Sequence, residues 1–238
     1  MTRLMTYNIH AGVGRDGVCD IGRAAALIDH AGPDVVALQE VSARPRGSAD
    51  DDQFRALAEA TGMTALPGRT LVEGGFGYGN LLLTRRPVLD WRRIDLSRPP
   101  LERRGAIVAR LDAGWARPLT VIATHLGLSP RERRWQLDRL AEQVARAAPQ
   151  GPVAVLGDLN LWAIDLPALL RLRRRTGLPA PWWGNRATFP AVLPVLALDR
   201  IWTVPGRLRR RPRRLGGRLA RLASDHRPLI AEIDPPAG

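Results

Sequence analysis

The most informative stretch of the sequence is Val153-Ala154-Val155-Leu156-Gly157-Asp158-Leu159-Asn160. Its first four residues are apolar and rich in valine, which predicts a buried β-strand, and Gly157 permits a tight turn where that strand ends. Ligands of open α/β sheets bind at the carboxyl ends of strands, where Asp158 and Asn160 stand. A carboxylate can bind a metal ion or accept a proton there, and a carboxamide can donate to a phosphate oxygen. The same residues also suit an ordinary turn, so the interpretation depends on the other strand ends.

The composition is that of a folded α/β protein. The 238 residues, of which 45% are hydrophobic and 25% charged, can bury a sizeable core and do not resemble a disordered chain. No linker or repeat divides the sequence, so we expect one domain over residues 1–238. The sequence has no apolar run of transmembrane length and no signal-peptide pattern at its start. The single Cys19 excludes an internal disulfide, and we expect a cytoplasmic location.

The positive charge has two interpretations. The formal net charge is +13, and all 36 basic residues are arginine, which is also typical of a GC-rich coding bias. Six arginines lie between Arg207 and Arg214, close together enough to bind a phosphate backbone. The alternative, slightly favoured, is a solvated edge strand that its charges protect from aggregation.

Other predicted strands also end in polar side chains that suit phosphate chemistry. Carboxylates bind hard cations, amides bind phosphate oxygens, and histidines exchange protons. The donor types favour Mg²⁺ or Mn²⁺, and the sequence lacks both a zinc-type Cys/His set and a Gly-x-Ser-x-Gly elbow. Each of these residues also has a structural alternative, such as a satisfied core histidine or a turn. The strand-end groups are Asn8 and His10, Gln39 and Glu40, His125, and Asp225 and His226, with Asp199 as a further candidate.

The order of elements predicts a mixed fold. Strands predicted over 88–96 and 105–111 follow each other without a helix, which favours antiparallel pairing. Ser129 and Glu132 form a capping-box pattern around Pro130, and an apolar helical face follows. The glycine-rich segment 74–79 is predicted to be a loop that places Asn80 at the start of a strand.

Taken together, these motifs resemble the endonuclease/exonuclease/phosphatase superfamily, and in particular its small stand-alone bacterial members. The resemblance covers nearly the whole chain, with the motifs in the family's order. The motifs are Thr6-Tyr7-Asn8-Ile9-His10, Leu38-Gln39-Glu40-Val41, Gly79-Asn80, Thr124-His125-Leu126, Gly157-Asp158-Leu159-Asn160, Thr188-Phe189-Pro190, Leu198-Asp199-Arg200-Ile201 and Ser224-Asp225-His226.

The resemblance implies an α/β (α+β) fold, a four-layer α/β/β/α sandwich of two mixed β-sheets flanked by helices. It also implies metal-dependent hydrolysis of a phosphate ester by direct attack of water, at a site on one end of the sheets. Glu40 would be the principal Mg²⁺ ligand, with Mn²⁺ as a substitute, and Asn8 and Asp225 would lie in the metal shell. Asp158 would position and deprotonate the attacking water.

The same resemblance assigns roles around the phosphoryl group. Asn160, His125 and His226 would hold its oxygens as charge develops. Asp199 would accept a hydrogen bond from His226 and fix the tautomer of that ring. His226 remains an alternative to Asp158 as the base.

Two further residues are candidate substrate ligands. Asn80 belongs to one of the family motifs. Arg104 is predicted either to contact substrate phosphate or to pair with Glu102 at the surface. His10 stands where many nuclease members carry a carboxylate, and His125 stands where some repair nucleases carry a tyrosine. Both departures argue against an abasic-site nuclease.

The substrate is less determined than the reaction. The arginine-rich segment favours DNA or RNA, whereas a phospholipid or a small phosphate ester would suit an apolar rim, to which Trp182 and Trp183 are candidates. A non-catalytic module that binds nucleic acid or anionic membrane is a different class of function, and the intact set of strand-end groups argues against it. The sequence gives no sign of an obligate protein partner.

Overall fold

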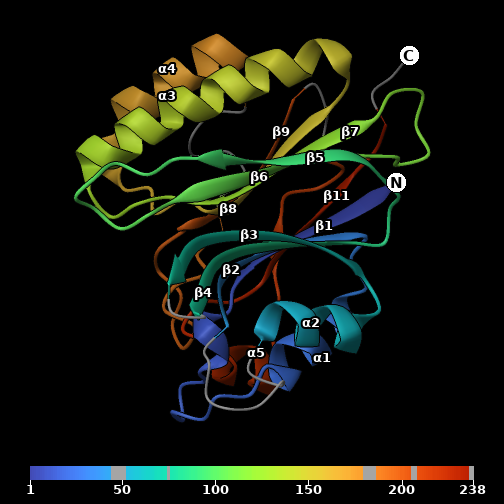
Figure 1. Cartoon of the computed structure of the whole chain (residues 1–238), viewed down its shortest axis with the longest axis vertical. Coiled ribbons are helices and arrows are strands. Elements are labelled where there is room, and N and C mark those ends of the chain that lie inside the picture. The colour runs from blue at the N-terminus through green and yellow to red at the C-terminus, as the bar shows by residue number, and fades with distance from the viewer. Residues whose placement is uncertain (44–51, 74–75, 179–185, 205–207, 236–238) are drawn as a thin grey trace.

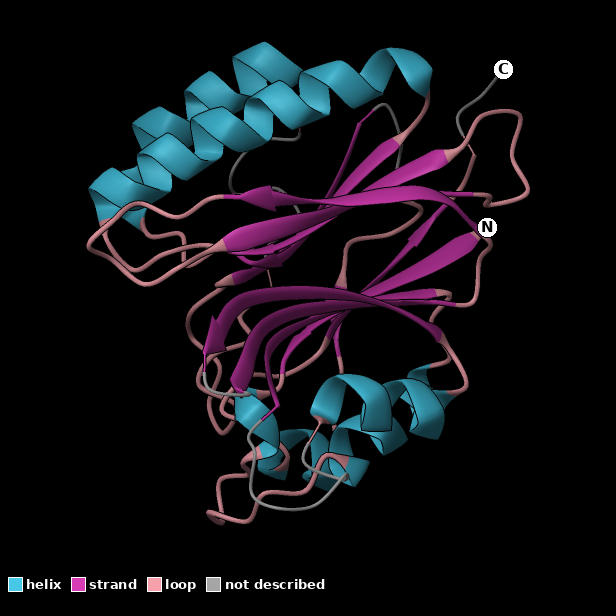
Figure 2. Ribbon diagram, viewed as in Figure 1, coloured by secondary structure: helices cyan, strands magenta, loops and turns pink. Residues whose placement is uncertain are grey.

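The computed structural model describes residues 1–43, 52–73, 76–178, 186–204 and 208–235. Two β-sheets pack face to face, and helices cover the outer face of each sheet (Figures 1 and 2). Each sheet contains both parallel and antiparallel neighbours. The four-layer sandwich of two mixed sheets predicted from the sequence is therefore confirmed.

The first sheet has six strands, and its only parallel neighbours are β1 and β2. Its outer face carries helices α1 (Gly22–Ala31), α2 (Gln53–Thr61) and α5 (Arg218–Leu222), which share one apolar cluster with the strands. In spatial order the strands are β10 (Arg213–Arg214), β11 (Leu229–Ile233), β1 (Thr2–Asn8), β2 (Val35–Ala43), β4 (Phe76–Thr84) and β3 (Thr64–Glu73).

The second sheet has five strands in sequence order, and β7 and β8 run parallel. Helices α3 (Pro130–Ala147) and α4 (Leu166–Thr176) cover its outer face (Figure 1). The strands are β5 (Val88–Asp95), β6 (Gly105–Leu111), β7 (Leu119–His125), β8 (Val153–Asp158) and β9 (Asp199–Val204).

The first four residues of strand β8, Val153 to Leu156, are all apolar because both faces of the strand are buried. Val153 and Val155 pack toward α3 and α4, whereas Ala154 and Leu156 pack toward the first sheet. A strand between two layers has no solvent face, so its sequence shows a continuous apolar run in place of alternation. The core of the molecule accordingly has three parts, one between the sheets and one beneath each helical layer.

Two local predictions need correction. β4 already begins at Phe76 and pairs with β3, which the sequence did not predict, so Asn80 lies inside a strand opposite Gly68. The predicted loop over 74–79 is therefore wrong for residues 76–79, which belong to β4. Residues 74–75 lie outside the described part of the chain. At α3 the helix begins at Pro130 as predicted, but the Ser129 side chain makes no capping bond.

The arginine-rich segment is mainly irregular. Its described part forms only the short β10, at the edge of the first sheet, and α5 follows. Arg213 and Arg214 are exposed there, which agrees with the interpretation as a charged edge strand. Arg207 lies outside the described residues.

A buried ion pair fixes the loops beside the second sheet. Arg133 on α3 donates to Asp165 Oδ2 through Nε (3.0 Å), and its Nη2 lies 2.9 Å from the same oxygen. Its Nη1 donates to the carbonyls of Leu128 (2.6 Å) and Gly127 (3.3 Å). Asp165 Oδ2 also accepts from the Trp162 amide at 2.8 Å. One pair of charges therefore holds the loop after β7 and the loop after β8.

Asp165→Ala should lower the free energy of unfolding by about 3 to 5 kcal/mol, because it leaves the buried Arg133 guanidinium without its counter-ion. Urea unfolding followed by circular dichroism measures this change. The matched control is Asp138→Ala, which breaks an exposed pair with Arg175 and should cost less than about 1 kcal/mol. Equal losses in the two variants would contradict the structural role of the buried pair.

Candidate active site

Three neighbouring strands of the second sheet place polar residues side by side. In the strand register His125 on β7 is opposite Asp158 on β8, and Asp158 is opposite Asp199 on β9. Gly157 allows β8 to approach β7 closely, since a Cβ there would lie 1.8 Å from the carbonyl oxygen of Thr124. The strand register therefore brings His125, Asp158 and Asp199 together at one end of the second sheet.

The first sheet contributes Asn8 at the end of β1 and Glu40 on β2. Asn8 Nδ2 donates to Glu40 Oε1 (2.8 Å) and to Asp158 Oδ2 (3.1 Å), so one amide bridges the two sheets. Glu40 lies in a β-bulge between Leu38 and Val41, with φ of +58°. Bulges redirect side chains, and a non-glycine residue in the left-handed region is strained in a way that is common at functional sites.

His226 lies in a network of buried hydrogen bonds. Its Nδ1 donates to Asp199 Oδ2 at 2.9 Å, and the same oxygen accepts from Thr188 Oγ1 at 2.5 Å. The Phe189 ring packs 4.9 Å from the imidazole. Ser224 Oγ donates to the carbonyl of Asn8 at 2.8 Å and so ties this segment to β1.

The pKa of His226 is raised to about 10. Burial opposes the charged ring, but the negative charge of Asp199 and its hydrogen bond, together with Asp158 and Asp225, outweigh that effect. The ring is therefore a cation at neutral pH. Its Nε2 lies 3.6 Å from Asp158 Oδ2.

The pKa of His125, in contrast, is lowered. Burial, with smaller contributions from Arg104 and His226, lowers its pKa to about 4 against the attraction of Asp158. The ring is therefore neutral at pH 7. Two donors face the ring, Arg104 Nη1 at Nδ1 (3.1 Å) and Asn160 Nδ2 at Nε2 (3.2 Å), and a neutral imidazole can accept at only one nitrogen. Because Asn160 Nδ2 already donates to the carbonyl of Leu126 at 2.9 Å, we assign the acceptor to Nδ1 and the ring proton to Nε2. That N–H points toward the site, 3.6 Å from Asp158 Oδ2.

Arg104 makes the predicted pair with Glu102 at 2.8 Å, but it is buried, contacts His125 and lines a small cavity, so the pair is not a surface ion pair. Contact of Arg104 with a substrate phosphate stays a prediction. Asn80 Nδ2 donates to the carbonyl of Gly105 at 3.0 Å. Both side chains line this small cavity, which also reaches Glu40 and His125.

The remaining predicted residues lie around this centre. Asn160 has φ of +48°, its backbone N–H donates to Asp158 Oδ1, and its Nδ2 lies 3.2 Å from His125 Nε2. Asp225 is half-buried, and its Oδ1 accepts from Ser224 Oγ. His10 is exposed, and its ring contacts the carbonyl of Val13 at 3.2 Å, so it is a surface residue beside the site.

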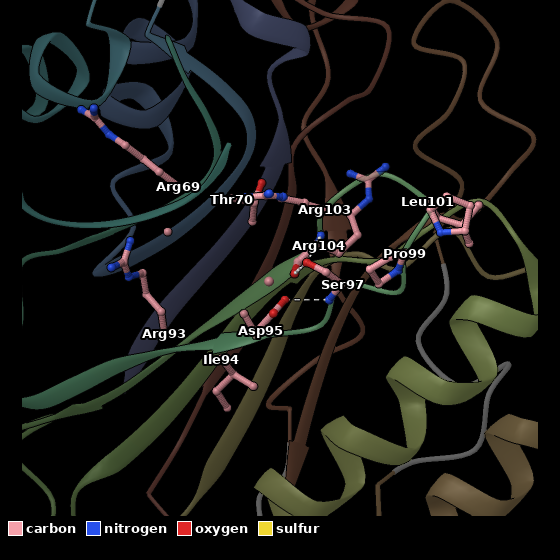
Figure 3. A pocket seen from close by; sticks show the side chains of 14 residues that line it. Arg69, Thr70, Arg93, Ile94, Asp95, Ser97, Pro99, Leu101, Arg103 and Arg104 are labelled. Carbon is pink, nitrogen blue, oxygen red and sulfur yellow. Dashed lines mark hydrogen bonds between the residues drawn. The ribbon is translucent and has the colours of Figure 1, made fainter. Parts of the chain in front are cut away.

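A wider pocket adjoins the small cavity. It has a volume of about 700 Å³ and opens beside β3, β5 and the segment before β6 (Figure 3). Its wall contains four arginines, Arg69, Arg93, Arg103 and Arg104, and one carboxylate, Asp95. Arg69 is paired with Asp52 at 2.6 Å and Arg104 with Glu102 at 2.8 Å. The wall therefore has a small excess of positive charge, which comes from Arg93 and Arg103.

Comparison with known proteins agrees with the site. The profile described as "Endonuclease/Exonuclease/phosphatase family" matches residues 5–226. The chain belongs to the endonuclease/exonuclease/phosphatase family. Members of this family are phosphoric ester hydrolases that use divalent metals.

Relatives from bacteria and animals share the fold. The YbhP protein of Escherichia coli K12 is 31% identical over 250 residues, covering 97% of this chain and 95% of that protein. An endonuclease/exonuclease/phosphatase structure from Beutenbergia cavernae has a TM-score of 0.76 at 25% identity, over 98% of this chain and 71% of that one. TDP2 of D. rerio, solved with a single-strand DNA product, has a TM-score of 0.73 at 19% identity over 98% of each chain. The last likeness concerns the fold alone.

The donor atoms of the site fit the divalent metal that the family uses. Glu40 and Asp158 converge on one amide of Asn8, and within the described residues Glu40 has no cationic partner, whereas Asp158 faces the His226 ring. A carboxylate whose charge no protein cation balances suits a hard divalent cation. A second cluster, Asp158, Asp199 and His226, has ligand atoms within 4.8 Å of one another. There, however, Asp199 and His226 already satisfy each other through Oδ2 and Nδ1.

Sequence reasoning overlooked two contributors to the site. Thr188 stands in a quoted motif but had no role, and it binds Asp199. Tyr78 lines the small cavity with Glu40; burial and then the Glu40 carboxylate raise its pKa. The sequence signal that could have indicated Tyr78 is its position between two glycines, two residues before Asn80.

The two buried histidines should titrate far apart. In metal-free protein at pH 7, long-range ¹H–¹⁵N spectra should show His226 as a cation and His125 as a neutral ring protonated at Nε2. The spectra of His125→Gln and His226→Gln assign the signals. Titration of either ring near pH 6.5 would contradict the electrostatics described above.

Proposed function

We propose that this protein is a metal-dependent phosphodiesterase in which Asp158 activates the attacking water. The observation that carries the proposal is the position of Asp158. Its carboxylate lies among Asn8, His125 and His226, and it is 2% exposed. A buried carboxylate surrounded by hydrogen-bond donors is held in one orientation, which is what a general base requires.

The metal in this proposal is Mg²⁺, with Mn²⁺ as a substitute. Glu40 would be its principal ligand, and Asn8 and Asp225 would complete the protein's share of the shell. When bound, the cation supplies Lewis-acid stabilisation of a phosphoryl oxygen. The strained backbone of Glu40 supports this assignment, because it directs the carboxylate toward Asn8.

The charge of His226 decides which residue acts as the base and which stabilises the phosphoryl oxygens. A ring with a pKa of about 10 already carries its proton at neutral pH and cannot accept another. Asp158 is therefore assigned as the base, and His226 as a cationic donor to the phosphoryl oxygens. Asp199 orients the ring through Nδ1 and leaves Nε2 to face the site.

His125 and Asn160 would provide neutral donors for the same oxygens. Because Arg104 occupies His125 Nδ1, the Nε2 proton is available to a ligand. Donors aimed at the place where charge develops stabilise the transition state most when water is excluded. Asn80 and Arg104 line the adjoining cavity and are proposed substrate contacts.

These residues recognise the phosphodiester itself and not the groups attached to it. Both nucleic acid and phospholipid carry such a diester. The arginine-lined pocket beside β3 and β5 suits an anionic substrate of either kind. TDP2 of D. rerio was solved with a single-strand DNA product, and this supports DNA as one substrate to be tested.

Asp158→Ala should lower kcat/KM for bis-p-nitrophenyl phosphate by about 10²- to 10⁴-fold, because the general base is lost. Glu40→Gln should raise the metal concentration needed for half-maximal activity. Both are assayed with Mg²⁺, Mn²⁺ or EDTA. Asp112→Ala, at an exposed carboxylate that accepts from the Gly114 amide, should behave as wild type. Full metal-dependent activity in Asp158→Ala would refute the assignment.

Asp199→Asn should move the alkaline limb of the pH–rate profile to lower pH. The sign follows from His226, whose pKa is held near 10 by the Asp199 carboxylate and falls toward its ordinary value when that charge is removed. The cationic donor is then lost at a lower pH, so kcat falls more than KM rises. Asp199→Glu should partly restore the limb, and an unchanged limb in Asp199→Asn would contradict the role of His226.

A further inference from the structure

Large aliphatic side chains surround the candidate active site on three loops. Among the described residues, the four large apolar side chains with the highest exposure, 68 to 72%, all lie on these loops. Two more on the same loops are about half exposed. We call the set the apolar rim; it consists of Leu128, Trp162, Ile164, Val192, Leu193 and Val195.

Each loop is anchored to a site residue. Leu128 follows His125 by three positions, and Trp162 and Ile164 follow Asn160 closely. The third loop, residues 191–195, returns to Phe189, whose ring packs against His226. The rim therefore stands at the site's end of the sheets.

The rim is held in place by buried polar groups. The Arg133–Asp165 pair binds the carbonyl of Leu128 and the amide of Trp162, which fixes the first two loops. The third loop is fixed by the buried Arg227, which donates to the carbonyls of Ala191 and Val192. Because these hydrogen bonds fix the backbone of the loops, the apolar rim is exposed in the folded protein.

Arginines flank the rim on both sides. Arg131 and Arg134 share a hollow with Ile164, and Arg214 donates to the carbonyl of Ala187 at 2.8 Å, shortly before the third loop. These three flanking arginines are exposed, and within the described residues none forms an ion pair. Their charge is available to an external anion.

We propose that the apolar rim docks this protein onto an anionic phospholipid surface, so that the site meets a lipid phosphodiester. Exposed apolar groups beside arginines match a layer whose hydrocarbon lies beneath negative headgroups. Five of the six tips are aliphatic and cannot stack on bases, which distinguishes the rim from a single-strand nucleic acid platform. The inference deepens the proposed phosphodiesterase function and rests on it for the reaction, but the docking itself is separately measurable.

The first experiment measures docking alone. Wild type is sedimented with sucrose-loaded vesicles of phosphatidylglycerol and phosphatidylcholine (1:1), and with vesicles of phosphatidylcholine only. We expect binding to the anionic vesicles, and at least a tenfold lower partition coefficient in Leu193→Asp/Val195→Asp. Arg131→Gln/Arg134→Gln should lower binding to the anionic vesicles by about tenfold.

The matched control is Leu89→Asp. Leu89 is an exposed leucine at the beginning of β5, and the opposite end of that strand, at Asp95, pairs with Gly105 beside the site. This control should bind vesicles as wild type does, and thermal unfolding should show that every variant is folded. Absence of vesicle binding in wild type, or equal binding in the rim variant, overturns the proposal.

The second experiment separates docking from catalysis. Headgroup release from the anionic vesicles is compared with hydrolysis of soluble bis-p-nitrophenyl phosphate. The ratio of the two rates should fall at least tenfold in the rim variant and stay constant in Leu89→Asp. Rim-dependent vesicle binding without hydrolysis of either diester supports docking and refutes the phosphodiesterase function. Rim-dependent binding of single-stranded DNA without vesicle binding, or a rim-dependent dimer that binds no vesicles, overturns the lipid proposal.

Discussion

The hydrogen bonds of the Asn8 amide are the constraint on which the site depends. Through them Glu40 of the first sheet and Asp158 of the second approach the same group. Two carboxylates facing each other across a buried boundary repel, and a shared donor offsets part of that repulsion. The two sheets must therefore pack with their strand ends aligned, and the apolar layer between them, which includes Val35, Ala154 and Leu156, sets that alignment.

The electrostatic asymmetry of the two histidines follows from the same arrangement. His125 meets a guanidinium at Nδ1, whereas His226 meets a carboxylate there, and both rings are buried. One ring is thus neutral and the other cationic, although both direct Nε2 toward Asp158. Titratable groups whose pKa values are driven apart by their environments commonly divide the work of a catalytic site. In the proposed mechanism, this division assigns the role of the base to Asp158.

The polar strand ends could be predicted from the sequence because apolar runs and the polar residues that end them are local patterns, whereas the sandwich was implied by the family resemblance. The sequence did not predict β3, because that strand carries the turn-type pair Pro67-Gly68 in its middle, and so its antiparallel pairing with β4 was missed and Asn80 was placed at the start of a strand. The role of Arg104 was left open and Tyr78 was overlooked, because contacts between strands are not local patterns. Whether Arg104 lies at the surface or against His125 depends on how β6 packs beside β7, and no nearby residue encodes that.

The buried Arg133–Asp165 pair links the site to its surroundings. An apolar pair of the same volume would often stabilise the fold as well, since desolvation of two charges offsets most of their attraction. Apolar side chains, however, could not donate to the carbonyls of Gly127 and Leu128 or accept from the Trp162 amide. What the ion pair adds is therefore a fixed backbone in two loops that begin at His125 and Asn160. Loops held in this way can present aliphatic tips to a membrane without disturbing the histidine and amide at their bases.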